Sequence, residues 1–108
     1  MQSATLLTKG DIINILKVHK KELLREYGVK KIGMFGSVAR NEQTRESDID
    51  IIVELDYSDP EIHHKFFALY NYLENIFNKK VDIVTSNSLK NIRSKSIKDG
   101  ISRGILYA

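Results

Sequence analysis

Apolar residues recur along the chain with two periods, one typical of helices and one typical of strands. Between about residues 9 and 27 a largely apolar stripe recurs at steps of three and four residues, at Ile12, Leu16, His19, Leu23 and Tyr27. This spacing predicts an amphipathic helix, and Gly28 is suited to end it.

A second stretch with the helical period follows the chain's single proline. Ser58 or Asp59 can cap this helix, Pro60 suits its first turn, and Glu61 can complete a capping box with Ser58. The helix is predicted to extend to about Asn78. Its buried stripe is predicted to consist of Ile62, Phe66, Leu69, Leu73, Ile76 and Phe77.

The strand period is clearest between residues 48 and 55, where apolar and acidic positions alternate. This alternation places two sets of side chains on opposite faces of a strand. One set is Ile49, Ile51, Val53 and Leu55, and the other is Asp48, Asp50, Ile52 and Glu54. Two shorter apolar runs, at 29–35 and 81–85, predict further strands.

The remaining segments complete an alternating order of helices and strands. A brief helix start is predicted at about 37–41, and a last helix is predicted from a cap at Ser88 to about Asp99. Residues 101–108 fit either a frayed turn or a small edge strand. This order predicts an α/β fold with a small sheet flanked by helices. A chain of 108 residues, 42% of them hydrophobic, can bury one core, so we expect a single domain over residues 1–108.

Composition limits the metal ligands that the chain can offer and indicates where in the cell it is located. The chain has no cysteine, so a bound metal must take oxygen or imidazole ligands, which favours hard cations such as Mg²⁺. No apolar run approaches the roughly 20 residues that cross a bilayer, and the first residues lack the pattern of an export signal. We therefore expect a cytoplasmic protein without a membrane segment.

The net charge is +3, and the excess of positive charge lies near the carboxyl end. A solvated helix face explains such a run, and so does attraction of nucleotides, nucleic acid or an acidic partner. The basic residues concerned are Lys90, Arg93, Lys95, Lys98 and Arg103.

Candidate chemistry gathers around the strands predicted at 29–35 and 48–55. Gly36 and Ser37 form a turn in which a missing side chain and free backbone amides can accept a phosphate. Asp48 and Asp50 share one face of a strand, and two close carboxylates repel each other unless a divalent cation neutralises them. Asp82 can add a third carboxylate if its strand pairs beside theirs. Each feature alone is explained by an ordinary turn or an exposed charge, but their combined order indicates a two-metal site facing a phosphate.

These residues also carry a resemblance to a known family. The segment Phe35-Gly36-Ser37-Val38-Ala39-Arg40, followed after Ser47 by Asp48-Ile49-Asp50, resembles the defining motif of the minimal nucleotidyltransferases. This group belongs to the polymerase beta-like superfamily, and its most similar subgroup is the MNT antitoxins of HEPN/MNT toxin–antitoxin pairs. The Gly-Ser-x10-Asp-x-Asp spacing is highly specific, and the similarity covers essentially the whole chain.

The resemblance implies a fold, a reaction and a partner. The fold would be the nucleotidyltransferase fold, a small mixed sheet flanked by helices like the palm of polymerase beta. The reaction would transfer AMP from ATP to a tyrosine of a cognate HEPN ribonuclease toxin and inactivate it. A hetero-oligomer with the toxin is therefore expected, and nucleic acid is not an expected partner. The implied roles are binding of the triphosphate by Gly36, Ser37 and Arg40, and binding of two Mg²⁺ ions by the catalytic residues Asp48, Asp50 and Asp82.

Two other functions stay open on the sequence alone. A non-catalytic antitoxin would neutralise its toxin by direct binding and keep the motif only to hold a nucleotide. A basic nucleic-acid-binding protein would bind DNA or RNA without ATP.

A protein partner is favoured because no second domain is expected that could hold an acceptor. Aromatic residues off the buried stripe, with two histidines beside them, are candidates for the docking face. Ordinary packing at the flank of the helix explains them equally well. These residues are Phe67, Tyr70, Tyr72, His63 and His64.

Overall fold

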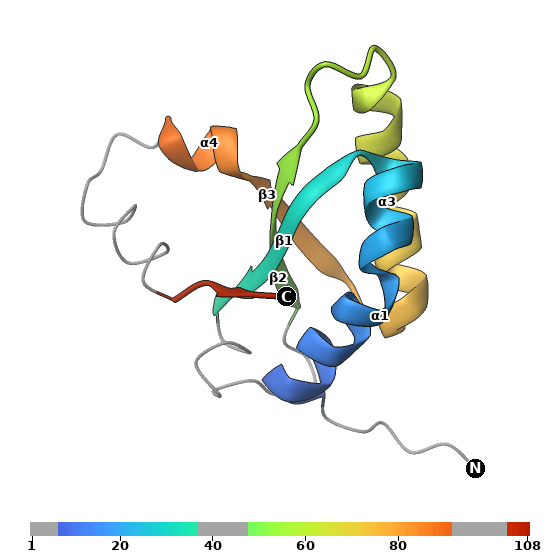
Figure 1. Ribbon diagram of the computed structural model, residues 1–108. Helices are drawn as coiled ribbons and strands as arrows, with labels where there is room; N and C mark the ends of the chain where they lie inside the picture. The colour runs from blue at the N-terminus through green and yellow to red at the C-terminus, as the bar shows by residue number, and fades with distance from the viewer. Residues whose placement is uncertain (1–6, 37–47, 92–103) are drawn as a thin grey trace.

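The computed structural model describes residues 7–36, 48–91 and 104–108, in which helices and strands alternate (Figure 1). The elements are α1 (Lys9–Tyr27), β1 (Val29–Phe35), β2 (Ile49–Leu55), α3 (Ile62–Phe77), β3 (Val81–Thr85), α4 (Ser86–Lys90) and β4 (Leu106–Tyr107). The predicted α/β fold is confirmed. No helix within the described ranges has the length and apolar character needed to cross a membrane.

Four strands form one mixed sheet in the order β3-β2-β1-β4. β1 runs antiparallel to both of its neighbours, β2 and β4, whereas β3 runs parallel to β2. Helices α1 and α3 cover one face of the sheet, and α4 lies on the opposite side (Figure 1). The two faces therefore have different surroundings.

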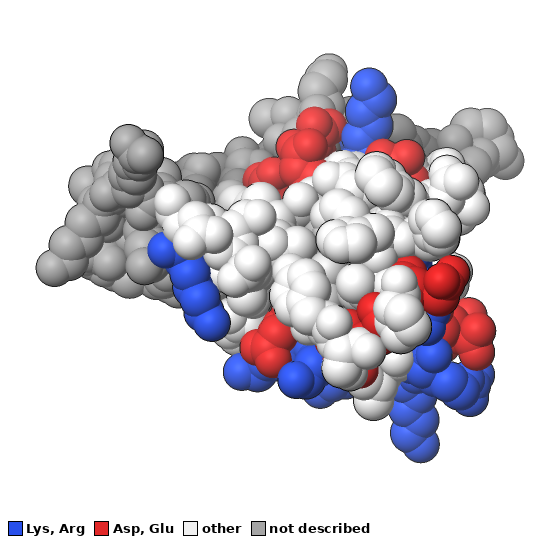
Figure 2. All heavy atoms as spheres, turned by 90° about the horizontal axis from the view of Figure 1, so that it is seen from above, with Lys and Arg blue, Asp and Glu red and all other residues white. Residues whose placement is uncertain are grey.

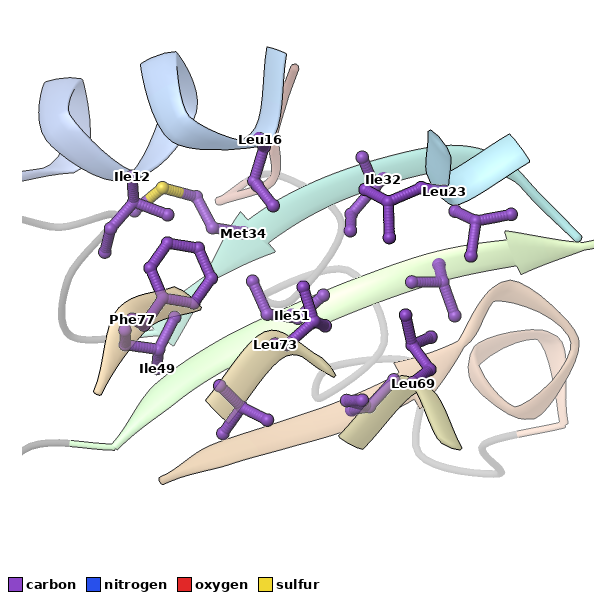
Figure 3. Packing of buried hydrophobic residues seen from close by; sticks show 14 of the residues in the cluster. Ile12, Leu16, Leu23, Ile32, Met34, Ile49, Ile51, Leu69, Leu73 and Phe77 are labelled. Atoms are coloured by element: carbon purple, nitrogen blue, oxygen red, sulfur yellow. The ribbon is translucent and has the colours of Figure 1, made fainter. Parts of the chain in front are cut away.

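The two-residue period of β2 divides its side chains between these faces, as predicted. Its apolar set, Ile49, Ile51, Val53 and Leu55, belongs to the core that α1 and α3 complete (Figure 3). Asp50 and Glu54 belong to the other face and are half-buried. Ile52 also belongs to that second face and is only 1% exposed, so the middle of the second face is covered as well.

Helix α1 has the predicted bounds, and both of its ends are capped. At the start, the Thr8 hydroxyl accepts a hydrogen bond from the Asp11 backbone N–H at 3.1 Å, and the Asp11 carboxylate accepts from the Thr8 N–H at 2.9 Å. At the end, Gly28 adopts a left-handed conformation with φ of 65°. A Cβ on Gly28 would lie 2.7 Å from Ile62 Cδ1, so the end of α1 packs directly against the start of α3.

The predicted capping box of the second long helix is wrong. α3 begins at Ile62, and no side chain caps it. The backbone N–H and hydroxyl of Ser58 donate instead to the Asp56 carboxylate, while Asp59 accepts from the Glu61 N–H at 2.9 Å. Carboxylates two residues back are strong local acceptors, and they close turns that precede the helix.

The predicted cap of the last helix is also wrong. Thr85, and not Ser88, caps α4, because the Thr85 hydroxyl accepts from the Ser88 N–H at 3.0 Å. The predicted continuation to Asp99 and the brief helix start at 37–41 lie mostly outside the described residues. For the final segment the edge-strand interpretation is confirmed by β4.

Hydrogen bonds join the end of the chain at β4 to β1 and to α1. The Ala108 N–H donates to the Ile32 carbonyl at 3.0 Å, and the Lys20 ammonium donates to the Ala108 carbonyl at 3.1 Å. Gly33 of β1 pairs with Tyr107 and is buried under it. A Cβ on Gly33 would lie 2.8 Å from the Leu106 carbonyl oxygen, so only glycine permits this approach.

Replacing Gly33 with alanine should therefore detach or shift β4. We expect Gly33→Ala to lower the free energy of unfolding by about 1–3 kcal/mol, the usual cost of overpacking, as measured by urea unfolding. The matched control is Gly10→Ala, because a Cβ there meets only the Thr8 hydroxyl at 3.7 Å. Alanine in a helix should leave stability unchanged or raise it by up to about 1 kcal/mol. Equal stability of both variants would contradict the close approach of β4.

Stability should also depend on pH through Asp59 and Lys65. The hydrogen bond from Lys65 lowers the pKa of Asp59, and the same bond raises the pKa of Lys65. A lowered carboxyl pKa stabilises the fold above the unfolded value of about 3.9, and this contribution disappears as pH falls through the folded pKa. The raised lysine pKa stabilises the fold below about 10.4, and its contribution disappears as pH rises through the folded value.

Asp59→Asn should therefore be less stable than the wild type at pH 7, and the difference should shrink towards zero at pH 2. Urea unfolding at both pH values measures it. Asp59→Asn/Lys65→Met should show the same loss of pH dependence as Asp59→Asn, because the two groups act through one bond. A difference that stays constant between pH 7 and pH 2 would show that the pair does not titrate with folding.

Candidate functional site

Two of the predicted acids occupy matching positions on neighbouring strands. Asp50 is the second residue of β2, Asp82 is the second residue of β3, and the parallel register pairs them directly. Paired residues of adjacent strands point to the same face, so both carboxylates leave the sheet on its second face. The predicted pairing of the strand at 81–85 beside the strand at 48–55 is thus confirmed.

The third predicted acid lies at the entrance of the same strand. Asp48 immediately precedes β2 and is exposed, as is Asp82, whereas Asp50 is half-buried. The exposed ends of β2 and β3 thus carry acids where the strands leave the core. Burial of the alternate residues Ile49 and Ile51 holds Asp50 on the second face.

The glycine turn packs directly against Asp50. β1 ends at Phe35, which pairs with Asp50 in the antiparallel register. The next residue, Gly36, has φ of 76°, a left-handed conformation that favours glycine. A Cβ at this position would overlap the Asp50 carboxylate and lie 2.9 Å from its Cγ. Gly36 therefore lies directly against the acid, and the Asp50 carboxylate takes the space that a side chain would occupy at this position.

Ser37 and Arg40, the other predicted phosphate contacts, lie outside the described residues. Their roles stay predictions.

The donor atoms at this end of the sheet suit a hard divalent cation. The predicted grouping of three acids is not found, because within the described ranges no three His, Cys, Asp or Glu side chains lie close enough together to hold a metal ion. Mg²⁺ is usually bound by one or two carboxylates together with substrate phosphates, and dedicated protein cages are uncommon for it. Asp50 and Asp82 fit that mode, with Asp48 beside them at the start of β2. Their assignment as metal ligands stays a prediction.

The aromatic residues considered for docking do not form one face. Tyr70 donates from its hydroxyl to the Ile83 carbonyl of β3 at 3.3 Å. A hydrogen bond of 2.7 Å joins the Tyr72 hydroxyl to His19 Nδ1 on α1. Both tyrosines are partly buried against the core, which is ordinary packing. Phe67 is different, because 72% of it is exposed.

The two histidines beside Phe67 are both exposed. Nδ1 of His64 lies 3.4 Å from the Glu61 carboxylate, so this ring has a local partner. We keep Phe67 with His63 as the part of the docking hypothesis that the structure favours.

Two residues on the second face of the sheet were missed by the sequence analysis. The ammonium of Lys31 lies 5.2 Å from the centre of the Tyr107 ring, and Tyr107 is half-exposed. The signal that could have located them is Gly33, since glycine inside a predicted strand often marks a close approach of another backbone. An edge strand was one of two interpretations of residues 101–108, but β4 has only two residues, which is too short for periodicity to indicate its partner.

Sequence comparison relates the chain to proteins that transfer nucleotides. Residues 16–107 match the nucleotidyltransferase domain family. MJ1215 of Methanocaldococcus jannaschii, provisionally named a protein adenylyltransferase, is 55% identical over 82 residues, which are 76% of this chain and 93% of that protein. Protein adenylyltransferase MntA of Thermococcus cleftensis is 41% identical over 92 residues, which are 85% of this chain and 91% of that protein.

Solved structures share the same architecture. A chain provisionally named a minimal nucleotidyltransferase superposes with a TM-score of 0.71 at 20% identity, covering 94% of this chain and 97% of that one. At that identity the likeness shows the fold alone. A toxin–antitoxin crystal structure with AMP-PNP superposes with a TM-score of 0.58 at 25% identity, covering 84% of this chain and 70% of that one. Because the family match spans most of the sequence, the chain belongs to the nucleotidyltransferase domain family.

Proposed function

We propose that the chain is a Mg²⁺-dependent protein adenylyltransferase, an antitoxin that transfers AMP from ATP to a tyrosine of a cognate HEPN ribonuclease toxin. The observation that carries the proposal is the in-register pair Asp50 and Asp82 beside the turn at Gly36. The names of the relatives MJ1215 and MntA support adenylyl transfer to a protein. The toxin–antitoxin structure with AMP-PNP supports an adenine nucleotide and a toxin partner.

In this reaction the tyrosine oxygen attacks the α-phosphorus of ATP. The bond from that phosphorus to the bridging oxygen breaks, pyrophosphate leaves, and the hydroxyl proton is released to water. Two Mg²⁺ ions, when bound, would lower the pKa of the attacking hydroxyl and neutralise the departing pyrophosphate.

The chain's own residues would bind the ions and the nucleotide and would orient the nucleotide for attack. Asp48, Asp50 and Asp82 would hold the ions, and the turn at Gly36 would admit the triphosphate to the backbone. Ser37 and Arg40 would add phosphate contacts. Because little covalent chemistry is required of the protein, positioning and charge neutralisation supply the rate.

Neutralisation by binding alone is the second candidate function. The strong exposure of Phe67 fits it, since an exposed aromatic anchor serves a non-catalytic inhibitor as well as an enzyme. Direct nucleic-acid binding has less support. Figure 2 shows Lys and Arg side chains of the described residues scattered at the margin of one face, next to Asp and Glu, around an uncharged centre.

Removing either paired acid should abolish transfer without abolishing the complex. We expect Asp50→Asn and Asp82→Asn each to reduce labelling of the purified toxin by α-labelled ATP by at least about a hundredfold. Glu54→Gln is the matched control, because Glu54 lies on the same face of β2 and its ion-pair partner Lys30 is surface-exposed. That variant should label the toxin at the wild-type rate.

Two results would reject catalysis as the cause of inhibition. One is a wild-type chain that inhibits the toxin without labelling it, and the other is full inhibition by both Asn variants with no label on the toxin. Either would leave inhibition by binding as the function.

Gly36→Ala tests the contact between the turn and the acid. A Cβ there must displace the Asp50 carboxylate, and a displacement of about 1 Å costs on the order of a hundredfold in rate. We expect a loss of that order in toxin labelling, while circular dichroism shows a folded chain. Gly10→Ala, where a Cβ makes only an ordinary contact with the Thr8 hydroxyl, should keep full activity. Unchanged activity of Gly36→Ala would show that the contact between Gly36 and Asp50 is not needed for transfer.

A further inference from the structure

We propose that Tyr107, with Lys31 beside it, is a positioning residue that stacks on the base of the bound nucleotide. The inference rests on the proposed function, because it places a nucleotide at Asp50 and Asp82. It adds a base-binding position on β4, on the same face of the sheet.

Strand register places Tyr107 on the reactive face. Gly33 and Phe35 are two residues apart on β1, so they belong to one face. Phe35 pairs with Asp50 on one side, and Gly33 pairs with Tyr107 on the other. Tyr107 and Asp50 therefore point away from the same face of the sheet, which is not the face that α1 and α3 cover.

The separation suits a nucleotide. Asp50 and Tyr107 lie two strands and two residues apart, which is about 12 Å between Cα atoms for ordinary strand spacings. A phosphate held near Asp50 and a base held at Tyr107 are joined by a ribose, and that distance is one that a nucleotide can bridge from its phosphates to its base. A base would thus extend across the sheet towards β4.

Tyr107 is held firmly but remains accessible. Its neighbour Ala108 donates its N–H to the Ile32 carbonyl, and its own backbone pairs with Gly33, which has no side chain to push β4 away. Even so, 50% of Tyr107 is exposed. A rigid aromatic residue with exposed surface loses little conformational entropy on binding, which favours its use in recognition.

The chemistry of the pair fits a nucleobase. Every nucleobase offers a π-face that stacks on an aromatic ring. The Lys31 ammonium lies 5.2 Å from the centre of the Tyr107 ring, which is a cation–π contact. Lys31 is two residues further from Phe35 along β1 than Gly33 is, so its charge lies beyond the proposed base position and not at the phosphates.

The experiment compares two probes, AMP-PNP and inorganic tripolyphosphate, by isothermal titration calorimetry in the presence of Mg²⁺. Tyr107→Leu should weaken AMP-PNP binding about tenfold, the effect of one lost stacking contact. It should leave tripolyphosphate binding unchanged, because that probe has no base. Tyr107→Phe keeps the ring and should bind AMP-PNP like the wild type.

The matched control is Tyr57→Leu. Tyr57 is 53% exposed, but it borders a hollow of about 560 Å³ at the other end of β2, with Leu55 and Ser86. Loss of the Tyr57 ring should change neither the affinity for AMP-PNP nor the affinity for tripolyphosphate. Urea unfolding of each variant checks that β4 still contributes to stability.

The outcomes separate the inference from the function beneath it. A wild-type chain that binds neither probe overturns the proposed function and this inference with it. Wild-type binding of AMP-PNP with an unchanged affinity in Tyr107→Leu overturns the inference alone. Equal losses for both probes also overturn it, since they indicate a displaced site. A higher KM for the toxin with unaltered AMP-PNP affinity would assign Tyr107 to the partner instead.

Discussion

The two-residue alternation along β2 is the constraint on which the rest of the structure depends. Each of its core-facing side chains gains about 1.5–3 kcal/mol by leaving water, and a slip of one residue would forfeit all of these gains together. The same slip would turn Asp50 into the core, where an unpaired carboxylate is costly. Burial of Ile49 and Ile51 thus fixes the direction of the acid between them, so the hydrophobic core orients the candidate site.

β2 transmits this orientation to both of its neighbours. Phe35 of β1 and Asp82 of β3 flank Asp50, so residues that are 15 and 32 positions away from it in the sequence meet it at one point of the sheet. The turn after β1 then comes to lie against the carboxylate, because Gly36 takes a conformation that other residues avoid. Core packing thus supplies the alignment of acids and turn that a nucleotide-transfer site requires.

Features that depend on local periodicity were predictable from the sequence, and features that depend on competition between partners were not. The stripe of α1, its end at Gly28 and the acidic face of β2 follow from spacing alone. The starting caps of α3 and α4 were assigned wrongly because several acceptors compete within a few residues, and contacts from the following helix, such as Lys65 on Asp59, decide among them. The strand order, and with it the register of Asp50 with Asp82, is set by pairing between distant strands and could be read only from the folded sheet. The roles that the motif implies stay predictions for all of the site residues, which are Gly36, Ser37, Arg40, Asp48, Asp50 and Asp82.

A division between the two faces of the sheet explains how so short a chain can hold both a core and a reactive surface. One face is covered by α1 and α3 and supplies the stability, while the other carries Asp50, Asp82 and, through Gly33, the ring of Tyr107. Because alternate residues of the same strands serve both purposes, each strand residue adds either to the core or to the site. Under the proposed function the acceptor has to come from outside the sheet, and a protein partner that brings its own tyrosine would satisfy that requirement without enlarging the fold.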